Sequence, residues 1–175
     1  LLHTLSKNFN VLGTCKKYTQ NQNIREMDIS VAIEVEAIFN SFNPDVVINC
    51  AAYTSVDGSE INKELAYNVN VKGLRNIIQN SSPSTYIIQI SSDYVYDGKN
   101  APYLESDHTY PVNYYGKTKL EAENILRGSN REYLILRPNV LYSNKLNSKA
   151  NFFGWIYCQL NKNKSIKVVD DQISN

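Results

Sequence analysis

The chain has 175 residues, of which 42% are hydrophobic and 20% are charged, and its formal net charge is +1. These values are typical of a globular protein with a substantial core, so we expect residues 1–175 to form a single domain. A nearly neutral chain without a basic run argues against nucleic acid or an acidic membrane as its main partner, and no apolar run is long enough for a transmembrane helix.

Strand and helix patterns alternate along the chain. In order, we expect a strand at 10–14, a helix at 30–42, a strand at 45–50, a helix at about 59–79, a strand at 85–90, a helix at 114–126, a strand at 132–137, a helix at 151–160 and a strand at 165–169. The run at 45–50 is continuously apolar at its centre, which is typical of a parallel strand covered on both faces. The alternation predicts an α/β fold with a Rossmann-like, doubly wound parallel sheet.

Polar clusters follow three of the predicted strands, at 51–54, 91–94 and 139–142. In doubly wound sheets, ligands bind beyond the carboxyl ends of the strands. Ala51 and Ala52 are small enough to let a flat cofactor approach the backbone, and the hydroxyl of Ser92 could face a substrate oxygen. The alternative is that Ser91 and Ser92 only satisfy backbone groups at the end of their strand.

Tyr115 and Lys119 are four residues apart in the predicted helix at 114–126, so their side chains share one face. Tyrosine has an unperturbed pKa of about 10 and is a poor acid near neutrality. A cation about 4 Å away contributes roughly 4 kcal/mol at an effective dielectric of about 20, enough to make the phenol a usable proton donor. The alternative is an ordinary pair on a helix surface.

The chain shows no pattern of metal ligands. Cys15, Cys50 and Cys158 are odd in number and lack Cys-x-x-Cys spacing, which indicates reduced thiols in a cytoplasmic protein. The two histidines, His3 and His108, are far apart in sequence. We therefore expect no metal site.

Four sequence blocks occur in a characteristic order and at characteristic separations. They are Pro-Asp-Val-Val-Ile-Asn-Cys-Ala-Ala-Tyr-Thr-Ser-Val-Asp at 44–57, Ile-Ser-Ser-Asp-Tyr-Val-Tyr-Asp-Gly at 90–98, Asn-Tyr-Tyr-Gly-Lys-Thr-Lys-Leu at 113–120 and Val-Val-Asp-Asp-Gln-Ile at 168–173. Together they resemble the extended short-chain dehydrogenases/reductases and, within them, the dTDP-4-dehydrorhamnose reductase family. The resemblance implies an NAD(P)H-dependent reductase that acts on a 4-keto nucleotide sugar in dTDP-L-rhamnose biosynthesis. A homodimer is a possible assembly of such a protein.

The resemblance also implies roles for individual residues. Tyr115 would give a proton to the 4-keto oxygen, Lys119 would lower the phenol pKa and bind the nicotinamide ribose, and Ser92 would polarise the ketone. Residues expected to contact the sugar are Ser92, Asp93, Tyr94 and Val140. Residues expected to line the cofactor are Asp28 and Ile29 beside the adenine, together with Ala51, Ala52, Tyr53, Thr54, Tyr115 and Lys119. Asn70 matches the asparagine that holds the backbone of the active-site helix, although it could also be an ordinary surface amide.

The chain departs from the family pattern in ways that affect these expectations. We expect the family's first strand and glycine-rich phosphate turn to be missing, with Leu1 already in the helix that follows them, and the C-terminal substrate region to be truncated. Residues 139–175 would then be only the start of the substrate-binding portion. Val140 stands where the family has a tryptophan that contacts substrate. We therefore read the chain as a fragment of a longer protein.

The turn after the first predicted strand indicates which nicotinamide cofactor the protein prefers. Members that prefer NAD often carry Asp where this chain has Cys15, and Lys16 and Lys17 follow. Two cations suit the 2′-phosphate of NADP, so we expect NADPH over NADH, with NAD still open. The alternative is that both lysines are solvated turn residues.

Two other functions remain open. One is a sugar-nucleotide epimerase or dehydratase of the same superfamily, which would return the hydride to the sugar and consume no cofactor. The other is non-enzymatic, namely the regulatory β subunit of methionine adenosyltransferase, which shares the fold and the Ser-Ser-Asp-Tyr-Val block at 91–95. The Asp-Asp-Gln sequence at 170–172 favours the reductases over both.

Overall fold

The computed structural model describes residues 1–17, 23–139, 141 and 152–167. The chain divides into two compact units, residues 1–137 and residues 138–175. The second unit begins one residue before position 139, where we expect the substrate-binding portion to start, and its described part contains helix α7 (Phe152–Leu160). The strand predicted at 165–169 is not formed over 165–167, and its last two positions lie outside the described residues.

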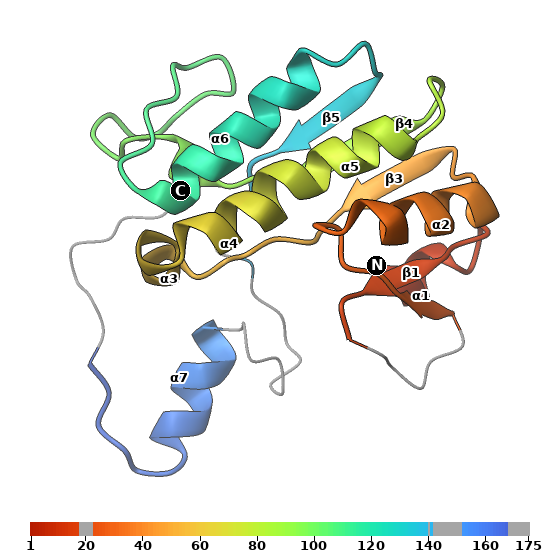
Figure 1. The fold of residues 1–175 in the computed structure, drawn as a ribbon. Coiled ribbons are helices and arrows are strands. Elements are labelled where there is room, and N and C mark those ends of the chain that lie inside the picture. Colours follow the sequence, from red (N-terminus) through yellow and green to blue (C-terminus); the bar gives the residue numbers. More distant parts are fainter. Residues whose placement is uncertain (18–22, 140, 142–151, 168–175) are drawn as a thin grey trace. The chain divides into compact units, whose positions relative to one another are not determined.

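Two parallel sheets form the frame of the first unit (Figure 1). Strands β3 (Val46–Asn49), β4 (Tyr86–Ile90) and β5 (Tyr133–Leu136) pair in the order β3-β4-β5, and β1 (Gly13–Cys15) pairs with β2 (Ile24–Glu26). Every pairing is parallel, as the sequence predicts. The sequence pattern misses β2 because only one of its three residues is apolar.

The first helix of this unit precedes β1, and the others connect β2 to β3, β3 to β4 and β4 to β5. The helices are α1 (Leu2–Leu5), α2 (Ala32–Phe42), α3 (Val56–Ile61), α4 (Lys63–Tyr67), α5 (Gly73–Asn80) and α6 (Tyr114–Arg127). The single helix predicted at 59–79 is in fact the end of α3 followed by α4 and α5, which are joined by a π-helical turn, Asn68–Lys72. Helix α6 begins where the side-chain oxygen of Asn113 accepts a hydrogen bond from the Gly116 N–H at 2.8 Å, a standard N-cap.

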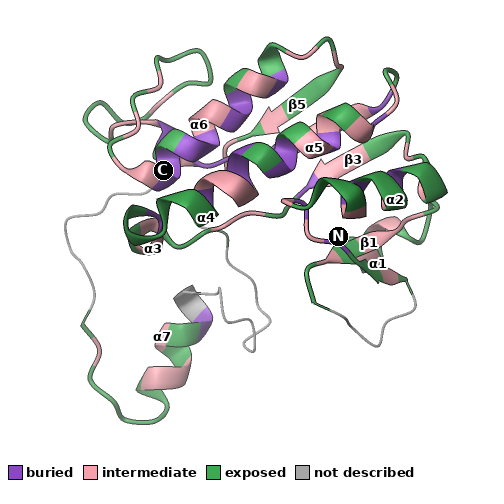
Figure 2. Cartoon of the chain, viewed as in Figure 1, coloured by how far each residue is buried: buried purple, intermediate pink, exposed green. Residues whose placement is uncertain are grey.

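The hydrophobic core lies between the sheet and helices α2, α5 and α6, whose inward faces are buried (Figure 2). Its buried members are Met27, Ile29, Val35, Phe39, Leu74, Ile77, Ile87, Ala122 and Leu126. Ile135 of β5 packs against this cluster. Leu134 and Leu136 therefore point to the opposite face, because side chains alternate along a strand, and each is 42% exposed. In the described part of the first unit, the helices thus cover mainly one face of the sheet.

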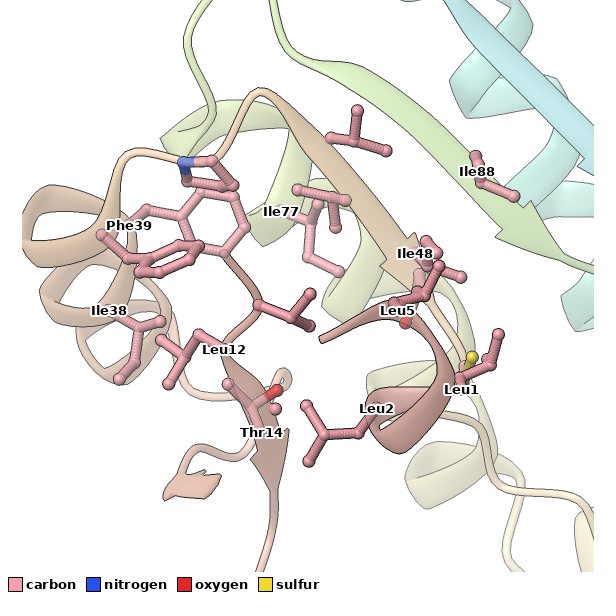
Figure 3. Close-up of a pocket in the computed structure, with 18 of the residues that line it drawn as sticks. Leu1, Leu2, Leu5, Leu12, Thr14, Ile38, Phe39, Ile48, Ile77 and Ile88 are labelled. Carbon is pink, nitrogen blue, oxygen red and sulfur yellow. The ribbon is translucent and has the colours of Figure 1, made fainter. Parts of the chain in front are cut away.

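An apolar cavity of about 780 Å³ separates the two sheets. It is lined by β1 and β3 and by the leucines of α1, and Figure 3 shows Leu2, Leu12, Ile48 and Ile77 around it. Strands β1 and β3 are not hydrogen-bonded to each other, although both belong to parallel sheets. None of the described helices is long and apolar enough to cross a membrane.

Candidate active site

The candidate site is centred on Ser92, directly after β4, and on Tyr115, in the first turn of α6. Both residues are buried, each only 7% exposed. The Ser92 side chain acts on the pKa of the Tyr115 phenol as a hydrogen-bonding partner, so the two side chains lie close together. Ser92 Oγ also donates to Asp93 Oδ1 at 3.0 Å and accepts from the Tyr94 N–H at 3.3 Å. The structure therefore brings together the serine and the tyrosine that the sequence suggests.

A close approach of backbones makes this meeting possible. A Cβ atom built on Gly116 would lie 2.1 Å from the carbonyl oxygen of Tyr94, so only glycine fits at this position. The start of α6 can therefore press against the 3₁₀ turn Asp93–Val95. The rings of Tyr94 and Tyr115 also meet edge to face, with centroids 5.7 Å apart.

The pKa of Tyr115 differs from the sequence-based expectation. Burial of the ring raises the phenol pKa above 10, and the hydrogen bond with Ser92 opposes this rise only in part. The negative charge of Asp93 raises the pKa further. The expected lowering by Lys119 is therefore wrong for this arrangement, in which Lys119 does not act on the phenol.

Lys119 is instead held at the end of β4. Its ammonium group donates a hydrogen bond of 2.6 Å to the carbonyl oxygen of Ile90, and the residue is only 3% exposed. Burial lowers the pKa of Lys119 to about 8, although the negative charge of Glu123 and the Cys50 thiol raise it in part. The spacing of Tyr115 and Lys119 thus places both on α6 as expected, but the ammonium points to a backbone carbonyl.

Asn70 links the predicted cofactor-lining segment at 51–54 to α6. Its side-chain oxygen accepts from the Tyr53 N–H at 2.8 Å, and its amide nitrogen donates to the Tyr53 carbonyl at 3.2 Å and to Thr118 Oγ1 at 2.9 Å. Thr118 in turn donates to the Tyr115 carbonyl at 2.7 Å. Asn70 is only 3% exposed, so it is not a surface amide, and it reaches the helix through the Thr118 side chain.

The residues expected to bind the adenosine end of the cofactor also lie together. Lys16 Nζ is 2.6 Å from Asp28 Oδ2, and the other oxygen of Asp28 accepts from the backbone and the hydroxyl of Ser30. Partial burial would raise the Asp28 pKa, but these hydrogen bonds, Lys16 first, hold it below its usual value. Ile29 is buried in the core, and Lys17 is exposed.

The structure describes most, but not all, of the other residues expected to contact the cofactor or the sugar. Ala51 and Thr54 are exposed and Ala52 and Tyr53 are half-buried, so this segment is open to a ligand. Tyr94 is 38% exposed. Val140 lies outside the described residues. Among the residues that the structure describes, no three His, Cys, Asp or Glu side chains gather to hold a metal ion.

One buried group beside the site was missed by the sequence reasoning. Glu123 is fully buried on α6, where it binds Ser91, Arg127 and Arg137. The available signal was its spacing, since Tyr115, Lys119 and Glu123 follow one another at four-residue intervals on a helix that is otherwise amphipathic. A charged residue on the buried face of a helix requires a partner.

Comparison with known proteins gives a consistent assignment. A family model described as RmlD substrate binding domain matches residues 1–175. The dTDP-4-dehydrorhamnose reductase of Aggregatibacter actinomycetemcomitans is 38% identical over 151 residues, which are 85% of this chain and 50% of that protein. The methionine adenosyltransferase 2 subunit beta of Xenopus tropicalis is 35% identical over 145 residues, 81% of this chain and 43% of that protein. The chain thus spans about half the length of the curated relatives it matches.

Two solved structures of dTDP-4-dehydrorhamnose reductases share the fold of this chain. A crystal structure of a hypothetical dTDP-4-dehydrorhamnose reductase from Sulfolobus tokodaii superposes with a TM-score of 0.81 at 33% identity, covering 94% of this chain and 57% of that one. The dTDP-4-dehydrorhamnose reductase of Bacillus anthracis, in complex with NADP, gives a TM-score of 0.73 at 30% identity and covers 81% of this chain and 51% of that one.

Proposed function

Because the chain belongs to the RmlD substrate binding domain family, we propose that the protein containing it is an NADPH-dependent reductase of a 4-keto nucleotide sugar. The substrate we propose is dTDP-4-dehydrorhamnose, which gives several of the curated relatives their name. The observation that carries the proposal is the closeness of the buried Ser92 and Tyr115 side chains, with Lys119 buried on the same helix as Tyr115.

The side chains suit the reduction of a ketone. The Ser92 hydroxyl can turn from Asp93 to donate to the keto oxygen, and Tyr115 can give that oxygen a proton. A raised phenol pKa keeps Tyr115 protonated at neutral pH, so the donor is loaded before reaction. The phenolate left by proton transfer is a far stronger base than water, and it regains a proton from solvent. The role we propose for Lys119 is to stabilise this phenolate, which requires its ammonium to turn from the Ile90 carbonyl toward Tyr115.

The residues also fit a nicotinamide cofactor. Its chemistry is the delivery of a hydride to the carbonyl carbon, which complements the proton from Tyr115. Lys119 has the donors to bind ribose hydroxyls. Its ammonium donates to the Ile90 carbonyl, which Gln89 Nε2 also contacts at 3.0 Å. The exposed, small side chain of Ala51 leaves room for a flat ring beside the sheet edge.

The test is consumption of NADPH, followed at 340 nm, by the full-length protein with dTDP-4-dehydrorhamnose. We expect oxidation that depends on the sugar nucleotide and that stops at one NADPH per sugar reduced. An epimerase or dehydratase would change the sugar without net loss of NADPH. Isomerisation of the sugar nucleotide without NADPH loss would therefore refute the reductase proposal.

A second candidate is a regulatory subunit, because a methionine adenosyltransferase subunit beta is 35% identical over most of this chain. Such a protein would bind the cofactor without reducing a sugar. The discriminating result is a change in the activity of a methionine adenosyltransferase catalytic subunit on addition of the full-length protein, together with no NADPH oxidation.

A further inference from the structure

Glu123 is a fully buried carboxylate for which the proposed reaction has no direct use. It accepts hydrogen bonds from three separate elements. Ser91 Oγ, at the end of β4, donates to Oε1 at 2.6 Å. Arg137, directly after β5, donates from Nε to Oε1 at 3.0 Å and from Nη2 to Oε2 at 2.7 Å, and Arg127 of α6 donates to Oε2 at 2.7 Å.

These contacts fix the charge and the position of the carboxylate. Burial alone would raise the pKa of Glu123, but the bonds from Arg137 and Ser91 hold it below its usual value, so the group is ionised. The Arg137 side chain is only 12% exposed, and its two bonds form the bidentate pairing that resists rotation. A buried carboxylate whose two oxygens both accept hydrogen bonds is held in one position, and Glu123 is therefore a rigid point in the fold.

This rigid point adjoins the site. Ser91 directly precedes Ser92, and Ile90, one residue earlier, accepts the hydrogen bond from Lys119. The end of β4 is therefore tied to α6 at two points one helical turn apart, at Lys119 through the Ile90 carbonyl and at Glu123 through the Ser91 hydroxyl. Together, these two hydrogen bonds set the position of Ser92 relative to α6.

We propose that Glu123 is a positioning residue that, through Ser91, aligns Ser92 with Tyr115 and sets the electrostatic surroundings of Lys119. The proposal rests on the proposed function, since the alignment serves the reduction. It assigns Glu123 no contact with substrate or cofactor. The ion pair with Arg137 contributes to this positioning, because it orients the Glu123 carboxylate toward Ser91.

The first test is Ser91→Ala in the full-length protein, which removes one hydroxyl and leaves both arginine pairs in place. We expect kcat to fall about ten- to a hundredfold because the reacting groups lose their alignment, while KM for the sugar nucleotide and Kd for NADPH stay within about threefold. The matched control is Ser81→Ala, at a buried serine whose hydroxyl donates to the Ile77 carbonyl at the end of α5. An unchanged kcat in Ser91→Ala, or an equal loss in Ser81→Ala, would overturn the proposal.

The second test needs no turnover, so it separates this proposal from the proposed function. Lys119 faces Glu123 on its own helix, the Cys50 thiol after β3 and the Ile90 carbonyl of β4. Glu123→Gln keeps an oxygen for Ser91 but removes the charge, so the pKa of Lys119, followed by NMR of lysine labelled with ¹³C at Cε, should fall below about 8. Glu121→Gln, at a half-buried residue that pairs with Arg75, should leave the pKa of Lys119 unchanged.

The outcomes are distinct. A wild-type protein that reduces no sugar refutes the proposed function. An unmoved Lys119 titration in folded Glu123→Gln refutes the electrostatic role of Glu123, and an unchanged kcat in Ser91→Ala refutes its positioning role. If Glu123→Gln does not fold, Ser91→Ala alone decides, because that variant leaves no charge unpaired.

Discussion

At the scale of the residue, the site depends on spacing along α6. Positions four apart are displaced by about 40° around the helix axis, so Tyr115, Lys119 and Glu123 form a shallow spiral rather than a straight row. Tyr115 faces Ser92, whereas Lys119 and Glu123 face the end of β4. The same spacing thus serves the proposed proton donor at one end and a structural anchor at the other.

Lys119 gives a prediction about stability and pH. Its pKa in the fold is about 8, below the 10.5 of a free lysine, so the unfolded chain binds more protons between these values. The free energy of unfolding contributed by Lys119 therefore rises as pH increases from about 8 to about 10.5, by up to roughly 3 kcal/mol. Urea unfolding of wild type and Lys119→Met across this range should show that rise in the difference between the two proteins. A pH-independent difference would contradict the assignment.

Lys16 and Lys17 give a prediction about the cofactor. Lys16 already pairs with Asp28, and Asp28 is held by Ser30, so the turn carries one neutralised cation and the positive charge of Lys17. We expect NADPH to be preferred over NADH, with modest discrimination because exposed lysine–phosphate pairs contribute little in water. Lys16→Ala/Lys17→Ala should weaken NADPH binding more than NADH binding in calorimetry. An equal loss for both would show that neither lysine contacts the phosphate.

At the scale of the element, the π-helical turn at Asn68–Lys72 stands out. Such turns widen a helix by one residue and often occur at functional sites. Here the turn carries Asn70, whose side chain spans from Tyr53 to Thr118. The turn therefore connects the segment after β3 to α6, the two elements that we expect to enclose the cofactor.

Asn70→Ala should loosen this connection. The change leaves the Tyr53 N–H and carbonyl without their side-chain partners, and we expect a loss of about 1–3 kcal/mol in the free energy of unfolding. NADPH affinity should fall as well, because the segment at 51–54 is no longer held. Chemical denaturation and calorimetry measure the two effects, with Asn80→Ala as a control at an amide that donates to the Asn76 carbonyl within α5. A stable variant with unchanged NADPH affinity would remove Asn70 from the site.

Periodicity predicted the elements that carry the site. The apolar runs at 45–50 and 85–90 became β3 and β4, and the helix expected at 114–126 became α6. Strand β2 was missed because it is short and mostly polar. The π-helical turn was missed because it lengthens one apolar interval, from Val69 to Leu74, by a single residue. The partners of Lys119 and Glu123 are tertiary contacts from β4 and β5, and no pattern within α6 specifies them.

At the scale of the whole molecule, the first unit presents a parallel sheet in two parts around an apolar cavity. The pieces that hold the candidate site, β3, β4, β5 and α6, lie on one side of that cavity and form their own paired sheet. The site geometry therefore depends on contacts within this half, whereas the predicted adenosine-binding residues lie beside β1 and β2. A full cofactor site would join both halves, which is why the experiments above use the full-length protein.

Tyr115→Phe tests whether Tyr115 is the proton donor of the proposed reductase. The variant keeps the ring and its packing on Tyr94 but removes the hydroxyl. In the full-length protein we expect NADPH affinity to be retained and the rate of dTDP-4-dehydrorhamnose reduction to fall by about two to four decades. Tyr114→Phe, at the neighbouring tyrosine whose ring lies 5.4 Å from Lys63 Nζ, should reduce at the wild-type rate. Wild-type turnover in Tyr115→Phe would contradict the account.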